Sequence, residues 1–138
     1  MFLLDTNVVS ELRKAPSGQA NPGVVAWFRR LAPHQLYVSV ITIVELEVGI
    51  LQLERRDASQ GNRLRHWLTA QVLPAFEGRI LPVDMAVGSR CAQLMVPDPQ
   101  SPWDALIAAT ALDHNLTIIT RNVRDFQATG VALHNPWS

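Results

Sequence analysis

The sequence predicts an α/β fold, specifically a three-layer α/β/α sandwich with a central parallel sheet. Short, almost wholly apolar runs recur along the chain, and longer stretches with apolar residues at helical spacing separate them. A strand that is apolar at every position is buried on both faces, as in a parallel sheet covered by helices. Glycine and proline are scattered and form neither a linker nor a repeat. We therefore expect a single domain over residues 1–138.

The strands are assigned to the short apolar runs, the clearest of which is Leu116–Thr120. They are expected at residues 2–4, 36–38, 80–83 and 116–120, with an edge strand at 131–133. The helices are assigned where apolar residues recur every three or four positions. They are expected at residues 6–13, 24–31, 42–56, 64–72, 86–96 and 103–114. Within these patterns Trp27, Trp67 and Trp103 are predicted to be core residues.

Composition excludes several classes of protein. The chain has 12 Lys and Arg against 12 Asp and Glu, so a uniformly basic nucleic-acid-binding surface is excluded and a polyanion must meet a local patch. A single cysteine rules out an internal disulfide and a cysteine zinc site, as expected in a reducing cytoplasm. No apolar run approaches the ~20 residues of a membrane span, and we expect no membrane association.

Acidic residues follow several of the predicted strands. Asp5 ends the first strand, Glu45 lies near the start of the helix after the second, and Asp104 opens a later helix. Asn122 and Asp125 follow the Leu116–Thr120 strand. In an open parallel sheet these positions line one crevice. Carboxylates that share a pocket repel each other unless a cation lies between them, and oxygen ligands alone favour Mg²⁺ or Mn²⁺.

A simpler interpretation exists for most of these acids. Glu45, Asp104 and Asp125 each stand three residues after a possible helix N-cap, namely Thr42, Ser101 and Asn122. Each could therefore belong to a capping box or be favoured by the helix dipole. Asp5 could cap the helix that begins at Thr6. Composition and spacing leave both interpretations open.

Four segments together resemble the PIN-domain nucleases, and in order and spacing the VapC-like toxins, including the FitB-like group. They are residues 2–11 (FLLDTNVVSE), 39–49 (SVITIVELEVG), 104–111 (DALIAATA) and 120–126 (TRNVRDF). The resemblance extends from residue 2 to about residue 135. It implies an Mg²⁺- or Mn²⁺-dependent endoribonuclease that acts as the toxin of a type II toxin–antitoxin system.

The resemblance also assigns roles to individual residues. Asp5, Glu45 and Asp104 correspond to the acidic triad that holds the ion. Many PIN domains have an aspartate where this chain has Asn122, so either Asn122 or the nearby catalytic candidate Asp125 completes the site. Thr6 and Thr120 are expected to orient the carboxylates through hydrogen bonds. Arg121 and Arg124, beside the expected ion, are candidates for contacts with RNA phosphates.

The same resemblance implies partners: an RNA substrate, a VapB-like antitoxin, a second copy of the chain in a homodimer, and operator DNA reached only through the antitoxin. An antitoxin tail across the acidic crevice could insert an Arg or Lys among the carboxylates. Apolar residues of the early helices could hold the apolar face of that tail, or they could be core. These residues are Val9, Leu12, Val24, Val25 and Phe28.

Two other functions compete with this one. The chain could be a nucleic-acid-binding regulatory subunit with weak or no nuclease activity, which the asparagine at position 122 favours. A phosphoryl-transfer enzyme of the haloacid-dehalogenase or response-receiver type would need an Asp-x-Asp motif or a late lysine. Residue 7 is Asn and the single lysine is Lys14, so that possibility is nearly excluded.

Overall fold

The structure, a computed structural model, describes residues 1–138 and contains the predicted parallel sheet. Its five strands have the order β3-β2-β1-β4-β5, and every neighbouring pair is parallel. The strands are β1 (Phe2–Leu4), β2 (Leu36–Ser39), β3 (Ile80–Leu81), β4 (Thr117–Ile119) and β5 (Leu133–His134). The first strand of the chain is therefore the central strand of the sheet, and the edge strand β5 lies slightly later in the chain than predicted.

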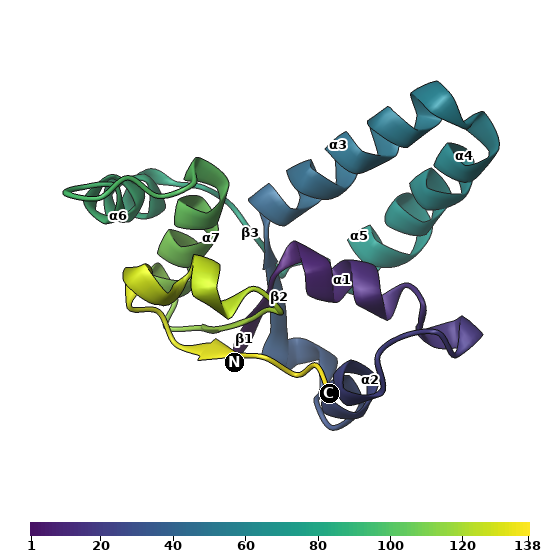
Figure 1. Cartoon of the computed structure of the whole chain (residues 1–138), viewed down its shortest axis with the longest axis horizontal. Helices are drawn as coiled ribbons and strands as arrows, with labels where there is room; N and C mark the ends of the chain where they lie inside the picture. Colours follow the sequence, from purple (N-terminus) through teal and green to yellow (C-terminus); the bar gives the residue numbers. More distant parts are fainter.

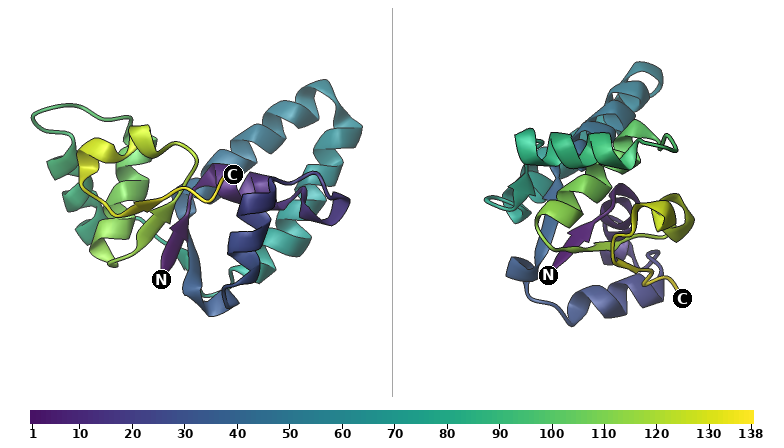
Figure 2. Two further views of the ribbon diagram at one scale, coloured as in Figure 1. Left: turned by 60° about the horizontal axis from the view of Figure 1, so that its bottom comes forward. Right: turned by 90° about the vertical axis from the view of Figure 1, so that its left-hand side faces the viewer.

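Helices cover both faces of the sheet (Figures 1 and 2). The seven α-helices are α1 (Thr6–Leu12), α2 (Pro22–Arg29), α3 (Val40–Arg56), α4 (Ala58–Trp67), α5 (Leu73–Ala75), α6 (Met85–Leu94) and α7 (Pro102–Asp113). A π-helical turn, Leu68–Val72, joins α4 to α5. None of these helices combines the length and the apolar composition needed to cross a membrane.

Two apolar clusters form the core, one on each face of the sheet. Successive residues of a strand point to opposite faces, so Leu4 and Ile119 enter one cluster and Leu3 and Ile118 the other. The first cluster receives side chains from α1, α2, α3 and the π-helical turn, and the second receives them mainly from α7. This is the three-layer α/β/α sandwich expected from the sequence.

The tryptophans predicted to be core residues differ in their burial. Trp27 is buried and packs edge-on against Phe2, with ring centroids 5.4 Å apart. Trp67 is only partly buried. The prediction for Trp103 is wrong, because its side chain is 47% exposed at the start of α7. The buried positions of that helix are filled mainly by small residues, among them Ala105, Ala108 and Ala109.

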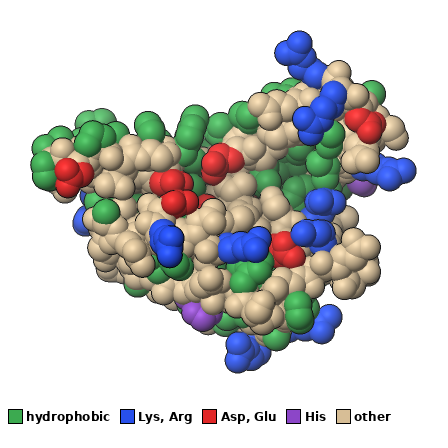
Figure 3. Space-filling model, viewed as in Figure 1, with side chains coloured by type: hydrophobic (Ala, Val, Ile, Leu, Met, Phe, Trp, Pro, Cys, Tyr) green, Lys and Arg blue, Asp and Glu red, His purple; other side chains and the backbone are tan.

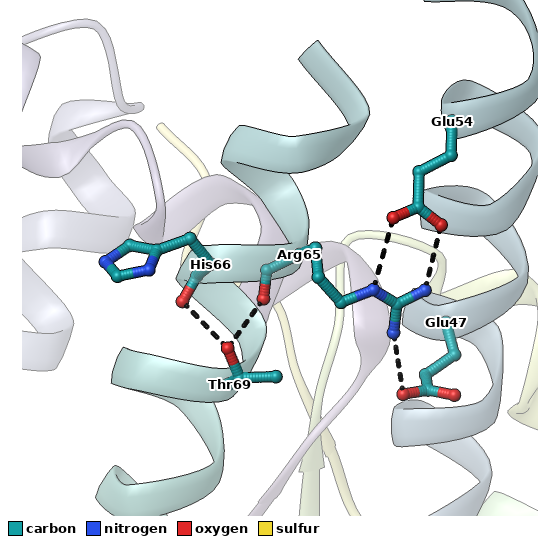
Figure 4. A network of polar contacts seen from close by, with 5 residues as sticks. All are labelled: Glu47, Glu54, Arg65, His66 and Thr69. Carbon is teal, nitrogen blue, oxygen red and sulfur yellow. Dashed lines mark hydrogen bonds and ion pairs between the residues drawn. The ribbon is translucent and has the colours of Figure 1, made fainter. Parts of the chain in front are cut away.

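Helices α3 and α4 form a hairpin that extends from the sheet (Figure 1). The Arg65 guanidinium of α4 bridges two carboxylates of α3: it donates at 3.0 Å to Glu54 Oε1 and at 3.1 Å to Glu47 Oε1 (Figure 4). The hydroxyl of Thr69 donates to the carbonyl of Arg65 in the turn that follows. Glu47 thus contributes to the helix hairpin rather than to the acidic crevice.

Candidate active site

The acidic residues identified in the sequence surround one open hollow at the carboxyl ends of the strands. Asp5 follows β1, Glu45 lies in the second turn of α3, Asp104 lies in the first turn of α7, and Asn122 follows β4. All four line a hollow of about 450 Å³. Figure 3 shows acidic side chains gathered on this face in the region between α7 and the start of α3. The parallel sheet thus brings together residues that are far apart in the sequence.

Asp5 is the most deeply buried carboxylate of the hollow. The Thr6 main-chain N–H donates to its Oδ1 at 2.8 Å, and the Thr120 hydroxyl donates to its Oδ2 at 2.8 Å. Burial nevertheless raises the pKa of Asp5 above its ordinary value, and the charges of Glu45 and Asp125 act in the same direction against the lowering effect of these hydrogen bonds. The predicted supporting role of Thr120 therefore has a direct geometric basis.

Glu45 is held in place by the other predicted supporting residue. The Thr6 hydroxyl donates to Glu45 Oε1 at 2.6 Å, and the hydroxyl of the fully buried Thr42 lies 3.3 Å from that of Thr6. Thr6 thus contacts one carboxylate through its main-chain nitrogen and a second through its side chain. It links Asp5 to Glu45 across the end of the sheet.

The pKa of Asp104 is strongly raised. Burial, followed by the negative charges of Asp5, Asp125 and Glu45, raises its pKa to about 6. None of the five ion pairs of the structure includes Asp5, Glu45 or Asp104. Their mutual repulsion is therefore not relieved by a direct ion pair with a cationic side chain.

The capping interpretation does not explain Glu45, Asp104 and Asp125. Helix α3 begins two residues earlier than predicted and is capped by the Ser39 side chain, which accepts from Ile41 N at 3.0 Å. Ser101 and Asn122 make no side-chain capping hydrogen bond. Of the four acids in question, only Asp5 caps a helix, through the bond that its side chain accepts from Thr6 N. A capping bond is therefore excluded for Glu45, Asp104 and Asp125, whereas the helix dipole still favours Asp104 in the first turn of α7.

The donor set suits a hard divalent cation that retains part of its water shell. No three His, Cys, Asp or Glu side chains converge closely enough to hold one ion directly. Mg²⁺ commonly takes only one or two carboxylates from a protein and keeps several waters. A hollow of this size, with repelling carboxylates on its walls and hydroxyl and amide groups between them, fits a hydrated ion of this kind.

Comparisons with known proteins show the family to which this chain belongs. The family model described as "PIN domain" matches residues 2–131. The chain belongs to the PIN domain family. This PIN domain is similar to Toxin FitB of Neisseria gonorrhoeae, with 41% identity over 99% of each chain. It is also similar to the VapC ribonuclease Y4jK of Sinorhizobium fredii, with 39% identity over 99% of this chain and 98% of the relative.

A solved structure confirms the fold of this PIN domain. The crystal structure of FitAcB from Neisseria gonorrhoeae superposes with a TM-score of 0.88 at 40% sequence identity, covering 99% of both chains. The α/β/α architecture predicted from the apolar runs is therefore confirmed. The roles of individual site residues remain predictions.

The remaining candidate residues separate into those inside the hollow and those outside it. Arg121 and Asn122 line it, whereas Arg124 and Asp125 do not. Asp125 lies in a short 3₁₀ helix, Val123–Asp125, and acts on the hollow through its charge, which raises the pKa values of Asp5 and Asp104. Of the two arginines predicted to contact RNA phosphates, only Arg121 lies in the wall of the hollow.

Sequence reasoning missed four residues in the wall of the hollow, namely Asn7, Ser10, Glu11 and Trp137. Asn7 places its side-chain amide 3.4 Å from Asp5 Oδ2 and its oxygen 3.4 Å from the Arg121 main-chain nitrogen. Ser10 and Trp137 also line the hollow. Asn7 and Ser10 lie on the same helix as Thr6. The helical spacing of the residues after Asp5 could therefore have identified them from the sequence. No signal in the sequence indicated Trp137, because its position depends on how residues 136–138 pack against Asn21 and Gly23.

A second hollow lies on the other side of α1. It has a volume of about 540 Å³, is lined mainly by apolar residues and includes Val9, Leu12, Val25 and Phe28 in its wall. Val24, the fifth residue of the predicted groove, is instead fully buried in the core. We call this hollow the apolar groove; Figure 3 shows apolar side chains in the recess between α1 and the α3–α4 hairpin.

Proposed function

We propose that this protein is the toxin of a type II toxin–antitoxin system and acts in the cytoplasm as a metal-dependent endoribonuclease. The observation that carries the proposal is that Asp5, Glu45 and Asp104 line one hollow and that none of them forms an ion pair with a cationic side chain. The names of its relatives, a toxin and a VapC ribonuclease, support the same conclusion.

In this proposal each residue has a defined task. Asp5, Glu45 and Asp104 hold Mg²⁺ or Mn²⁺, partly through water. The ion would lower the pKa of a water molecule and neutralise charge on the phosphate during hydrolysis. Thr6 and Thr120 fix the carboxylates through the hydrogen bonds described above. Asn122 supplies an amide oxygen to the hollow, and Asp125 adds negative charge from outside it.

Replacement of one acid tests the assignment. Asp104→Asn should abolish Mg²⁺-dependent cleavage of RNA and leave the metal-free fold intact, because it removes a charge that burial and its neighbours already disfavour. Attack by water should leave a 5′-phosphate and a 3′-hydroxyl, and RNA with a 2′-deoxy nucleotide at the cut site should still be hydrolysed. Full activity of Asp104→Asn, or a 2′,3′-cyclic phosphate product, would contradict the assignment.

A regulatory subunit that binds nucleic acid without cleaving it is the alternative. The observation in its favour is Asn122, which lines the hollow in place of an acid while Asp125 stands outside. The same assay separates the two functions. RNA binding by the purified protein with no Mg²⁺- or Mn²⁺-dependent cleavage would establish the alternative.

We further propose that a VapB-like antitoxin neutralises the enzyme by occupying the apolar groove. One solved relative is titled as a toxin–antitoxin complex from Klebsiella pneumoniae, and another as FitAB bound to IR36 DNA fragment. Helix α1 supplies walls to both hollows: Val9 and Leu12 to the apolar groove, Ser10 and Glu11 to the acidic one. A tail in the groove would need to cross only one helix, about 10 Å wide, to reach the carboxylates. Operator DNA would then be bound through the antitoxin.

The proposed homodimer has a candidate surface on α3. Val44, Val48 and Leu51 are 37%, 46% and 53% exposed and recur at helical spacing. A stripe of this kind on the long helix is the surface that a second copy of the chain could cover. The proposal rests on this stripe together with the resemblance to VapC-like toxins.

A further inference from the structure

One apolar side chain stands in the wall of the acidic hollow. Of the ten residues that line it, Trp137 is the single hydrophobic one. Its indole is partly buried and packs against the apolar cluster that also contains Leu4 and Trp27. The Arg121 guanidinium carbon lies 5.8 Å from the centre of the Trp137 ring, within the range of a cation–π contact. The hollow therefore contains an arginine–indole pair beside the carboxylates.

The residue after Trp137 fixes the indole in position. The Ser138 main-chain N–H donates to Asn21 Oδ1 at 3.1 Å. The side-chain amide nitrogen of Asn21 donates to the Ser138 main-chain oxygen at 3.2 Å. The Gly23 main-chain N–H donates to the Ser138 hydroxyl at 3.2 Å. These bonds attach residue 138 to the start of α2.

Gly23 allows this close approach. A Cβ at position 23 would lie 2.5 Å from the Pro136 carbonyl oxygen and 2.8 Å from the Ser138 main-chain nitrogen. Both are main-chain atoms, so a larger residue would have to displace residues 136–138. Residues 136 and 138, which flank Trp137, thus both pack closely against the start of α2.

We propose that the Trp137–Arg121 pair is a nucleobase-binding subsite, on which a base next to the scissile phosphate stacks. This inference rests on the proposed ribonuclease function. A strand whose phosphate reaches the carboxylates must place its neighbouring sugars and bases against the walls of the hollow. Among these walls only the arginine–indole pair offers a flat surface suited to stacking. Aromatic rings and guanidinium planes are the groups on which proteins stack unpaired RNA bases.

The pair also combines two properties that single-strand binding requires. Arg121 carries a positive charge at the edge of a hollow whose carboxylates would otherwise repel the RNA backbone. Trp137 supplies surface that accepts any base, because every base has a π-face. The subsite therefore positions the strand without reading a particular sequence, and Trp137 acts as a substrate-positioning residue.

The test is RNA binding without turnover. All variants are made in the Asp104→Asn protein, and affinity is measured by fluorescence anisotropy with a labelled single-stranded RNA that the wild type cleaves. Trp137→Ala should weaken binding by about 5- to 150-fold, the range for loss of one stacked base. Trp137→Phe should retain most of the affinity. Met85→Ala, which removes an exposed apolar side chain from α6 instead, should leave RNA binding unchanged.

Two further measurements link the effect to stacking and to position. An abasic nucleotide scanned along the RNA should reproduce the loss at one position, and at that position Trp137→Ala should cause no additional loss. Gly23→Ala keeps the tryptophan but displaces residues 136–138, so it should weaken binding as well. This variant also covers the case in which Trp137→Ala fails to fold.

The outcomes distinguish this inference from the proposed function. Cleavage by the wild type with unchanged RNA affinity of Trp137→Ala and Gly23→Ala would overturn the subsite and leave the ribonuclease intact. Loss of antitoxin affinity without loss of RNA affinity would assign the pair to the protein partner and would also overturn it. A wild-type protein that neither binds nor cleaves RNA would instead refute the ribonuclease function itself.

Discussion

Thr6 alone contacts two carboxylates of the acidic hollow. Its main-chain N–H contacts Asp5 and its hydroxyl contacts Glu45, which comes from a different helix. A serine or threonine at this position can make both contacts, whereas valine, which has the same shape, can make only the first. The residue that follows a strand-terminal acid therefore determines how the second acid is oriented.

Thr6→Val should weaken the metal site without removing a ligand. Loss of the hydroxyl leaves Glu45 unoriented, and loss of such supporting contacts typically lowers metal affinity about 10- to 100-fold. Titration of RNA cleavage with Mg²⁺ should show a higher metal requirement, with activity recovering at high Mg²⁺, and Thr6→Ser should behave like the wild type. Thr69→Val, which removes a hydroxyl that bonds only to main-chain carbonyls of α4, is the matched control. An unchanged metal requirement in Thr6→Val would refute this role.

Asp104 makes the stability of the metal-free protein depend on pH. Its pKa is about 6 in the folded protein against an ordinary 3.8. Between these values the folded state binds more protons than the unfolded chain, so this carboxyl lowers the free energy of unfolding as the pH rises from about 4 to about 6. The raised pKa of Asp5 acts in the same direction.

Urea denaturation across this pH range measures the effect. The stability of Asp104→Asn relative to the wild type should increase as the pH rises through 6 and then level off. Adding Mg²⁺ at pH 7 should stabilise the wild type more than the variant, because the ion binds the ionised carboxylate. Parallel pH profiles for the two proteins would show that Asp104 does not titrate as described.

At the scale of elements, the close contact between α3 and α4 depends on Gly61. A Cβ there would lie 2.5 Å from Glu54 Cγ and 2.6 Å from Glu54 Cα, so Gly61→Ala forces α4 away from the main chain of α3. Overpacking of this kind costs about 1–3 kcal/mol. At Gly49, in the middle of α3, a Cβ would meet no atom within 4 Å beyond the neighbouring residues and backbone of its own helix.

The two glycines make a matched pair of variants. In thermal or urea unfolding, Gly61→Ala should be destabilised. Gly49→Ala should be stabilised by about 0.5–1 kcal/mol, because alanine is the better helix former. Equal effects of the two substitutions would show that the hairpin contact is not as tight as described.

The elements differ in how far the sequence could predict them. The strand before Asp5 and the long helix α3 follow from the apolar pattern alone, since burial of an element is recorded in its own residues. The exposure of Trp103 could not be predicted, because a tryptophan in an apolar helical pattern is equally compatible with core and surface. Likewise, Glu45 and Asp104 could be identified as an acidic pair, but their orientation depends on Thr6 and on burial by other elements. Trp137 depends on Asn21 and Gly23, which are more than a hundred residues away.

At the scale of the whole molecule, the stripe on α3 makes a prediction about assembly. If a second copy covers Val44, Val48 and Leu51, a charge at the centre of the stripe should separate the copies, because burying an unpaired carboxylate is costly. Light scattering of Val48→Asp should give the mass of a monomer where the wild type gives a dimer. Met85→Asp, at an 85% exposed position on α6, should not change the mass. A dimeric Val48→Asp would place the interface elsewhere.

The two hollows on either side of α1 make a prediction about inhibition. A basic side chain of the antitoxin that enters the acidic hollow would occupy the place of the metal ion. A cognate antitoxin fragment should therefore inhibit RNA cleavage, and saturating Mg²⁺ should weaken the inhibition. Inhibition that is indifferent both to Mg²⁺ and to removal of the basic residues of the fragment would refute competition at this site. It would leave the ribonuclease assignment unaffected.

The central position of β1 has a consequence for biosynthesis. This strand is made first, yet it pairs with β4, and Asp5 is held by Thr120, 115 residues later. A nascent chain that ends before α7 carries Asp5 and Glu45 but lacks both Asp104 and the Thr120 hydroxyl that fixes Asp5. Pairing between such distant segments is also slow to form. Synthesis from the amino terminus therefore delays a complete acidic site until α7 and β4 have been translated. Under the proposed function, this interval gives the antitoxin time to be present before RNA cleavage begins.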